Sequence, residues 1–129
     1  INYLTKMGIK SILSLNSIEE TIFHEALKNK FKFERYVLPD HKYKRIANLN
    51  EINEVVDILY SLMRQSPVFV HCVASIERSP LIAMAWLIKN NNLSPQEALS
   101  YVMQIHPGTS PQTTQLKVLE KIYSSQQNI

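Results

Sequence analysis

Short apolar runs alternate along the chain with longer stretches whose apolar residues recur every three or four positions. The short runs are rich in β-branched and aromatic residues, and they predict strands over 9–15, 31–38 and 67–71. Strands that alternate with helices are typical of an α/β fold, with a mostly parallel central sheet flanked by helices on both faces. A length of 129 residues fits one compact domain over 1–129.

Side chains that cap helices mark where several of the predicted helices begin. Ser17 and Ser94 are each followed three residues later by Glu, which is the capping-box pattern. The other expected helices cover 2–7 up to Gly8, 49–63 after Asn48, and the stretch that begins at Ser110 and Pro111. For the helices that begin near Asn48, Ser94 and Ser110, the apolar residues expected to face inward are Leu49, Ile52, Val56, Leu59, Met63, Leu99, Val102, Met103, Leu116, Leu119 and Ile122.

The strand at 67–71 leads into the most informative part of the chain. Its apolar run 68–70 suits a central strand that is covered on both faces. After a short loop, Ser79 is expected to cap a helix, with Pro80 in its first turn. Residues 81–88 are apolar on all sides, which predicts a buried helix whose positive N-terminal end points back into the loop.

Composition narrows the range of functions. A charged fraction of 19% and a net charge of +3 are ordinary for a globular protein and suit an anionic substrate. Basic residues are not interleaved with aromatic ones as in nucleic-acid-binding surfaces, and no apolar run is long enough to span a membrane. A single cysteine excludes an internal disulfide and favours a reducing compartment such as the cytoplasm. Four scattered histidines do not predict a metal site.

Cys72 and Arg78 delimit a loop with the composition of an anion site. Successive loop amides and the planar Arg fork can surround a tetrahedral oxyanion, and positive surroundings favour a reactive thiolate. The residues expected to contact a bound phosphate are Val73, Ala74, Ser75, Ile76, Glu77 and Arg78. His71 is expected to support the loop, and the Ser79 hydroxyl to donate to the sulfur.

A lone cysteine at a strand end is more often an inert core residue. The neighbours of Cys72 argue against that interpretation. Given one cysteine, a preceding His, an Arg six residues later and then Ser or Thr coincide by chance on the order of once in ten thousand.

The pattern His71-Cys72, five residues, Arg78-Ser79 resembles the cysteine-based protein tyrosine phosphatases. The short chain and the Arg-Ser-Pro ending are similar to the dual-specificity branch. The resemblance implies that Cys72 is the nucleophile, that Arg78 clamps the phosphate and that Ser79 assists departure of the thiolate. It also implies further N-terminal strands before the segment that matches Tyr3. We expect a sheet edge that is either exposed or completed by residues that this chain does not include. The family usually has Gly at Ser75 and a small or neutral residue at Glu77.

A phosphate ester also needs a proton for its leaving group, usually from a carboxylic acid. Asp57 falls within a predicted helix and is expected to be a solvated surface residue. Asp40 follows a strand end and lies 32 residues before Cys72, a spacing close to that of dual-specificity phosphatases. An Asp beside a proline is also a common turn residue, but the Cys–Arg loop favours the general-acid interpretation.

Two further sets of polar residues each allow more than one interpretation. The basic residues that follow Asp40 would steer a phosphorylated substrate inward or simply be solvated; they are His41, Lys42, Lys44 and Arg45. Gln112 and Gln115 are both candidates to position water in the second step, and the sequence does not choose between them.

The sequence therefore predicts a phosphomonoester hydrolase that acts through a phosphocysteine intermediate without metal or organic cofactor. The expected substrate is a phosphorylated protein, tyrosine above all, and the expected state is a cytoplasmic monomer that binds no nucleic acid. Alternatives are a phosphate-binding module without turnover, a phosphatase of phosphoinositides, and a rhodanese-like sulfur-transfer domain. The 51 residues after Arg78 argue against the last.

Overall fold

A computed structural model describes residues 6–16, 30–39, 45–71 and 78–127. Its three strands, β1 (Ser11–Ser14), β2 (Lys32–Arg35) and β3 (Val68–His71), form a parallel sheet in the order β2-β1-β3. The described helices are α3 (Leu49–Met63), α4 (Arg78–Asn91), α5 (Pro95–Ile105) and α6 (Thr113–Gln127). The predicted α/β class with a parallel sheet is confirmed. The helices expected over 2–7 and after Ser17 lie largely or wholly outside the described residues.

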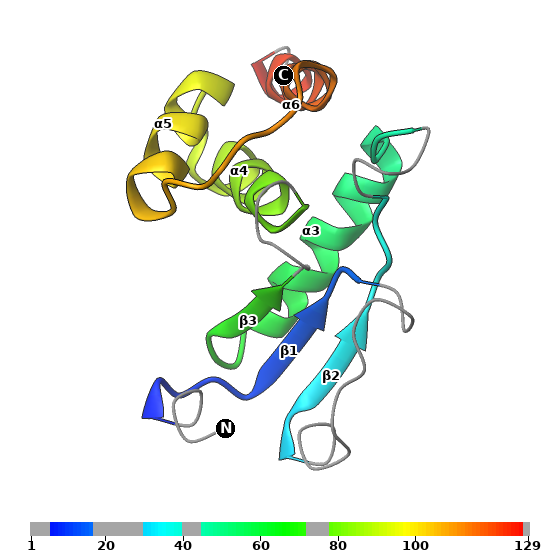
Figure 1. Ribbon diagram of the computed structural model, residues 1–129. Coiled ribbons are helices and arrows are strands. Elements are labelled where there is room, and N and C mark those ends of the chain that lie inside the picture. Colours follow the sequence, from blue (N-terminus) through cyan, green and yellow to red (C-terminus); the bar gives the residue numbers. More distant parts are fainter. Residues whose placement is uncertain (1–5, 17–29, 40–44, 72–77, 128–129) are drawn as a thin grey trace.

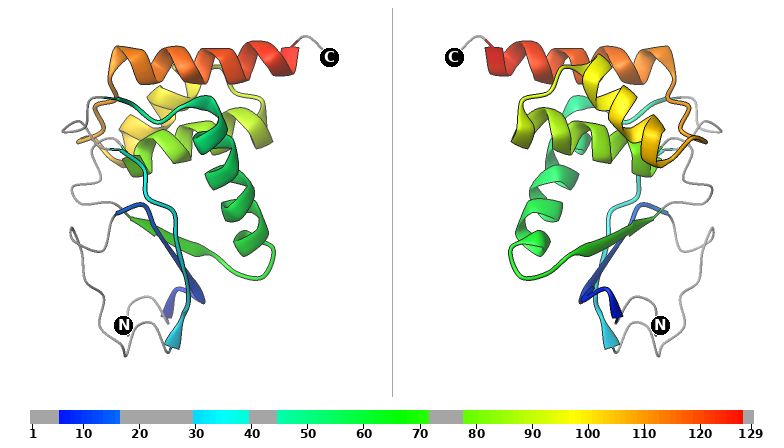
Figure 2. Two further views of the ribbon diagram at one scale, coloured as in Figure 1. Left: turned by 90° about the vertical axis from the view of Figure 1, so that its right-hand side faces the viewer. Right: turned by 90° about the vertical axis from the view of Figure 1, so that its left-hand side faces the viewer.

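All three strands run in the same direction, and their carboxyl ends point toward α4 (Figure 1). Helix α3 lies against one face of the sheet, and α4 packs with α5 and α6 beyond the strand ends (Figure 2). The largest core cluster joins β1 to α3, α4, α5 and α6. A smaller one, formed by Ile9, Ile12 and Phe31, lies at the amino-terminal ends of the first two strands. None of the described helices is long and apolar enough to cross a membrane.

Helix α3 begins where the sequence predicts. The Asn48 side chain accepts a hydrogen bond from the Glu51 amide at 2.9 Å, and the Glu51 carboxylate accepts one from the Asn48 amide at 3.0 Å. The predicted inward face is wrong at its ends, because Leu49 and Met63 are exposed. The buried residues of this helix are Ile52, Val55, Val56, Leu59 and Leu62. An apolar stripe does not show how far neighbouring elements extend to cover it.

Helices α5 and α6 follow the same pattern. The capping box at Ser94 is confirmed, with the Glu97 amide 3.2 Å from the Ser94 hydroxyl. Val102 is buried as predicted, whereas Met103 is 45% exposed because Ala98 and Val102 form the packed face. The last helix begins at Thr113 and not at Ser110, and it buries the expected Leu119 and Ile122, while Leu116 packs at the edge of the core.

The position of β3 in the sheet corrects a prediction. We expected a central strand covered on both faces, but β1 is the central strand of the described sheet, and its four residues are buried. No other described strand pairs with β3, and Phe69 is 39% exposed. Among the described strands, β3 therefore lies at the edge of the sheet. A run of apolar residues predicts a strand, but the order of strands depends on pairing between distant segments.

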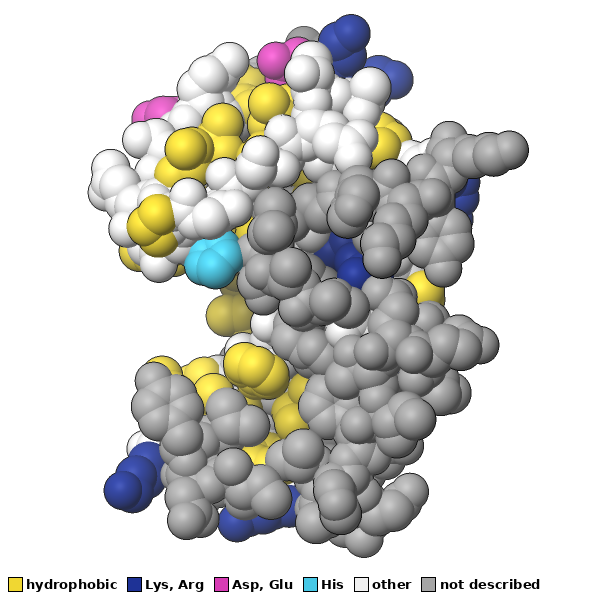
Figure 3. Space-filling view, viewed as in Figure 1, with side chains coloured by type: hydrophobic (Ala, Val, Ile, Leu, Met, Phe, Trp, Pro, Cys, Tyr) yellow, Lys and Arg dark blue, Asp and Glu magenta, His cyan; other side chains and the backbone are white. Residues whose placement is uncertain are grey.

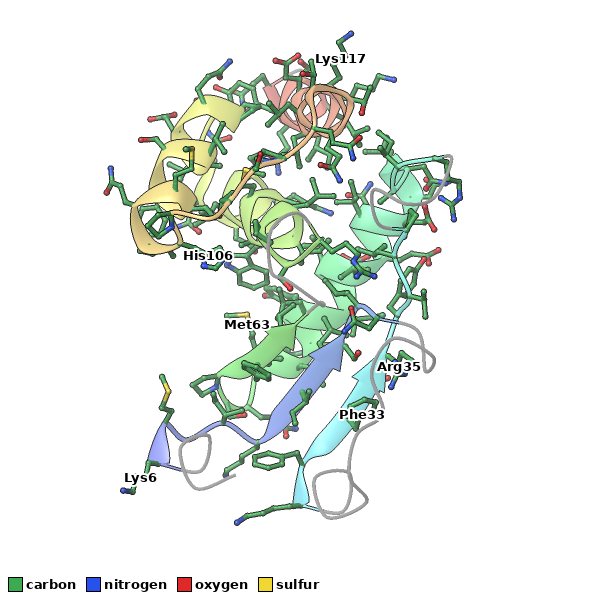
Figure 4. All side chains as sticks on the ribbon, in the orientation of Figure 1. Lys6, Phe33, Arg35, Met63, His106 and Lys117 are labelled. Carbon is green, nitrogen blue, oxygen red and sulfur yellow. The ribbon has the colours of Figure 1, made fainter. Side chains whose placement is uncertain are left out.

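Two apolar residues of β3 face an apolar pocket next to the helices. Val68 and Val70 line an apolar pocket of about 220 Å³, which α3, α4 and α5 also border. The surface is hollowed between the helical part and the sheet, and hydrophobic side chains are visible there (Figure 3). Met63 and His106 lie on opposite sides of this hollow (Figure 4). The strand is therefore half-buried against helices on one face.

Helix α4 starts earlier than the sequence suggests. It begins at Arg78, so Ser79 lies within the first turn and does not cap the helix as expected. Pro80 is in the first turn, as predicted, where its missing N–H costs no intrahelical hydrogen bond. The expected buried character is confirmed by the residues Leu81, Ile82, Met84, Ala85 and Ile88. Gly8 has a φ of +78°, the left-handed conformation expected where a helix ends.

Removing a central core side chain should destabilise the whole domain. Leu13 in β1 is fully buried, so Leu13→Ala should lower the free energy of unfolding by about 2–5 kcal/mol. Val37 follows β2, three residues after Glu34, which pairs with Leu13 in the sheet. Because Val37 is 44% exposed, Val37→Ala should change the free energy of unfolding by less than about 1 kcal/mol. Urea unfolding of the two variants would measure both. Equal losses would contradict the assigned core.

Candidate active site

The candidate site lies at the carboxyl ends of the parallel strands, where ligands bind in open α/β sheets. His71 ends β3 and pairs in register with Ser14 of β1, and α4 begins at Arg78. The loop between them, with Cys72, lies outside the described residues, as does Asp40. The other predicted phosphate contacts there are Val73, Ala74, Ser75, Ile76 and Glu77. The structure therefore places both flanks of the predicted anion loop.

Arg78 is only 3% exposed, and its guanidinium is held by distant backbone. Its Nη1 donates to the carbonyl oxygen of Leu15 at 3.4 Å and to that of Leu38 at 3.3 Å. These two residues follow β1 and β2, so the guanidinium lies where the strands end. Both bonds are long, and an anionic oxygen would bind the guanidinium more strongly than a carbonyl does. The Arg78 guanidinium therefore lies at the edge of the sheet where ligands bind in this class of fold.

Ser79 is half-buried in the first turn of α4. It lies on the side of this helix that borders the apolar pocket, together with Ile82 and Trp86. The first turn also carries the positive end of the helix dipole, which favours negative charge in the loop before it. Neither Asp nor Glu occurs in this first turn to offset that charge.

The turn after β1 contains buried polar residues that the sequence analysis missed. Ser14 and Asn16 have no exposed surface, and the Asn16 amide lies 3.4 Å from the Ser14 hydroxyl. Arg35 of β2 donates from Nη1 to the Asn16 carbonyl, and its guanidinium lies 5.4 Å from the centre of the Phe33 ring (Figure 4). These contacts hold the backbone beside the Leu15 carbonyl that Arg78 uses. Polar residues at the end of β1 and just after it were the available signal.

The described residues on either side of Asp40 make contacts with α3. On the upstream side, the Tyr36 hydroxyl donates to the Glu54 carboxylate. On the downstream side, the Arg45 guanidinium donates to both carboxylate oxygens of Glu51, at 2.6 and 3.0 Å. Arg45 is therefore paired with α3; the sequence had left open whether it steers substrate or is simply solvated. Asp57, the other aspartate, is exposed on α3, as expected.

These contacts shift the ionisation of the groups involved. The hydrogen bond to Glu54, with some burial, raises the pKa of Tyr36 to about 12. The hydrogen bonds from Arg45 and from the Asn48 amide hold the pKa of Glu51 below its usual value, against a smaller effect of burial. The same pairing raises the pKa of Arg45. Around neutral pH, Tyr36 is therefore a neutral donor, and Arg45 and Glu51 are oppositely charged.

Gln115 and Gln112 differ in their surroundings. Gln115 is 2% exposed at the start of α6, and its side-chain oxygen accepts the Gln112 amide at 2.7 Å. The Gln115 side-chain oxygen thus accepts a hydrogen bond from the backbone just before α6. No group of three His, Cys, Asp or Glu side chains within the described ranges is arranged to hold a metal ion.

A Cys-x5-Arg segment that joins a parallel strand to a buried helix, with its Arg at the strand ends, defines a cysteine-based tyrosine phosphatase domain. Residues 1–125 match the family described as "Dual specificity phosphatase, catalytic domain", and the chain belongs to that family. The predicted superfamily and branch are confirmed.

Two curated relatives illustrate the range of this family. The chain is 25% identical over 119 residues to "Phosphatidylglycerophosphate phosphatase PTPMT2" of Arabidopsis thaliana, covering 92% of this chain and 52% of the relative. It is 27% identical over 112 residues to "Dual specificity protein phosphatase 6" of Homo sapiens, covering 86% and 28% respectively. The chain thus spans about half the length, or less, of these relatives.

Solved structures share the fold. PTPMT1 in complex with PI(5)P superimposes with a TM-score of 0.80 at 24% identity, covering 93% of this chain and 80% of that one. The active form of Tk-PTP superimposes with a TM-score of 0.82 at 21% identity, covering 95% and 83%. These likenesses confirm the compact α/β phosphatase fold.

Proposed function

We propose that this chain hydrolyses phosphomonoesters through a phosphocysteine intermediate at Cys72. The observation that carries the proposal is the position of Arg78. A buried guanidinium, six residues after Cys72, is oriented by carbonyls from two other strand ends toward the edge of the sheet where anions bind. Membership of the dual-specificity family supports the same chemistry.

In the first step, the Cys72 thiolate attacks phosphorus in line with the bond to the leaving oxygen. The sulfur–phosphorus bond forms as that oxygen–phosphorus bond breaks, and Asp40 in its acid form gives its proton to the leaving oxygen. Arg78 and the amides of residues 73–77 stabilise the charge on the equatorial oxygens. His71 and Ser79 are assigned supporting roles, with the Ser79 hydroxyl stabilising the thiolate.

In the second step, water attacks the phosphocysteine. Asp40, now a carboxylate, accepts a proton from that water, and the sulfur–phosphorus bond breaks to release inorganic phosphate and the Cys72 thiolate. The enzyme thus returns to its starting protonation state. Each step uses only groups of the protein and water.

The substrate class is proposed as phosphorylated protein side chains, with phosphotyrosine preferred. The sequence supports this, because Glu77 adjoins Arg78 and adds a carboxylate next to the residue proposed to bind the phosphate. A polyphosphorylated lipid headgroup would bring additional negative charge to that region. The relatives favour a second candidate, a phospholipid phosphomonoester, since one is named as a phosphatidylglycerophosphate phosphatase and a solved structure holds PI(5)P.

The kcat/KM of the purified chain on different substrates distinguishes these candidates. The panel contains phosphotyrosine and phosphoserine peptides, phosphatidylglycerophosphate and PI(5)P, with both lipids presented in the same detergent micelles. The proposal predicts the highest kcat/KM for the phosphotyrosine peptide. Higher values for either lipid would establish a lipid phosphatase, and no hydrolysis of any substrate would leave a phosphate-binding module.

Glu77→Gly should shift the preference toward phosphoinositides. Two like charges at about 6 Å repel by roughly 3 kcal/mol at an effective dielectric constant near 20, and by less where water intervenes. Removing the carboxylate should therefore raise kcat/KM for PI(5)P more than for a phosphotyrosine peptide. Parallel changes on both substrates would show that Glu77 does not select between them.

A further inference from the structure

We propose that two contacts at the start of α3, Arg45–Glu51 and Tyr36–Glu54, position the general acid Asp40. This inference rests on the proposed function, because it assigns Asp40 the proton transfer to the leaving group. Residues 40–44 connect two described parts of the chain, and these contacts fix the ends of that connection. We call the four residues Tyr36, Arg45, Glu51 and Glu54 the α3 clamp.

The downstream half of the α3 clamp is bidentate. The Arg45 Nη1 and Nη2 lie 2.6 and 3.0 Å from the two Glu51 carboxylate oxygens, a geometry that fixes the guanidinium in orientation as well as position. The same carboxylate accepts the Asn48 amide at 3.0 Å, and the Glu51 amide donates to the Asn48 side chain at 2.9 Å. Glu51 is thereby held to the helix start while it holds Arg45.

The upstream half joins the chain before Asp40 to the next turn of the same helix. The Tyr36 hydroxyl donates to Glu54, which lies three residues after Glu51 and therefore on a neighbouring part of the α3 surface. Glu51 and Glu54 both lie in the first two turns of α3. One helix end thus holds the chain on both sides of residues 40–44.

A third attachment links this part of the chain to the phosphate-binding residue. The Leu38 amide donates to the Leu15 carbonyl at 3.1 Å, and the Leu38 carbonyl accepts from Arg78 at 3.3 Å. Pro39 is buried directly before Asp40. The backbone two residues before Asp40 is therefore in contact with the guanidinium that is proposed to hold the phosphate.

These attachments matter for catalysis more than for stability. The Arg45 side chain is 59% exposed, and ion pairs with an exposed partner contribute little to folding. A general acid must instead lie within hydrogen-bond reach of the leaving oxygen, and misplacement by about 1 Å can cost about a hundredfold in rate. Loosening one end of a five-residue connection enlarges the space that Asp40 samples.

The test compares substrates with good and poor leaving groups. Arg45→Met removes the bidentate pair, and the structure predicts an approximately tenfold loss of kcat on phenyl phosphate, whose leaving group needs a proton. The loss on para-nitrophenyl phosphate, whose leaving group departs largely without one, should be at most about twofold. KM should change little, since Arg45 is not placed at the phosphate. Arg45→Lys keeps the charge without the bidentate geometry and should recover part of the lost rate.

Two further variants separate the possible explanations. Asn48→Ala removes the helix cap but leaves the Arg45–Glu51 pair, so it should lower stability by about the amount of a lost cap and preserve the ratio of the two kcat values. Asp40→Asn is the reference for loss of the acid itself. Its loss of kcat should depend on the leaving group in the same way and should be larger than that of Arg45→Met.

The outcomes are distinct. A selective loss on phenyl phosphate in Arg45→Met, absent in Asn48→Ala, supports the α3 clamp. An equal loss on both substrates, or the same selective loss in Asn48→Ala, means that the contacts only maintain the fold and overturns the inference. If Asp40→Asn shows no dependence on leaving group, the general-acid assignment fails, and the α3 clamp has no role in proton transfer.

Discussion

Cys72→Ser should reduce hydrolysis of para-nitrophenyl phosphate to the uncatalysed background. A serine hydroxyl in the same position remains protonated at neutral pH, whereas a thiolate is the reactive form of cysteine. No other cysteine is present in the chain to replace it. Steady-state release of para-nitrophenolate from both proteins measures the effect. Comparable turnover would remove Cys72 from the mechanism.

The same variant should keep its affinity for phosphate-like anions. Among the described residues, Arg78 is held by the Leu15 and Leu38 carbonyls, and the substitution of Cys72 changes neither of these contacts. Calorimetric titration with vanadate should therefore detect binding to Cys72→Ser. Arg78→Ala is the matched variant for the anion site, and it should lose both binding and turnover. Loss of binding in Cys72→Ser alone would indicate that the variant is misfolded.

The second large effect is expected from Asp40→Asn, which should lower kcat by ~10²–10⁴ on substrates with poor leaving groups. An amide cannot supply the proton that the leaving oxygen needs. The loss should be smaller for substrates whose leaving group departs without a proton. The alkaline limb of the kcat–pH profile should also flatten, since that limb reports loss of the acid's proton.

Comparison of a series of aryl phosphates checks this assignment. A plot of log kcat against the pKa of the leaving group should be steeper for Asp40→Asn than for the unaltered protein. Asp57→Asn is the control, because Asp57 is exposed on α3 and has no assigned role. An equal loss across all leaving groups would make Asp40 a structural turn residue.

Local signals in the sequence predicted that each of the four described helices exists. Capping residues act within one turn, so Asn48 and Ser94 located two helix starts correctly. The burial of individual side chains depends on neighbours far away in the chain. For this reason Met63 and Met103, placed inside by helical periodicity, are exposed. The order of strands has the same origin, and the edge position of β3 could not be derived from its composition.

In the candidate site, too, local features could be predicted from the sequence and contacts between distant residues could not. The residue types and spacing from Cys72 to Ser79 indicated an anion site because that chemistry is local. The partners that orient Arg78 are backbone carbonyls 63 and 40 residues away, and any residue type supplies a carbonyl. The pairing of Arg45 with Glu51 was also missed, because the spacing of six residues across a helix start has no sequence signature.

The central claim, covalent catalysis at Cys72, is tested most directly by trapping the phosphoenzyme. Asp40→Asn is suited to this, because para-nitrophenyl phosphate can still phosphorylate Cys72 while removal of the phosphoryl group lacks its base. After reaction and rapid quenching, mass spectrometry of the peptides should find one phosphoryl group on Cys72. Release of para-nitrophenolate with no phosphorylated Cys72, or with the phosphoryl group on another residue, would contradict the mechanism.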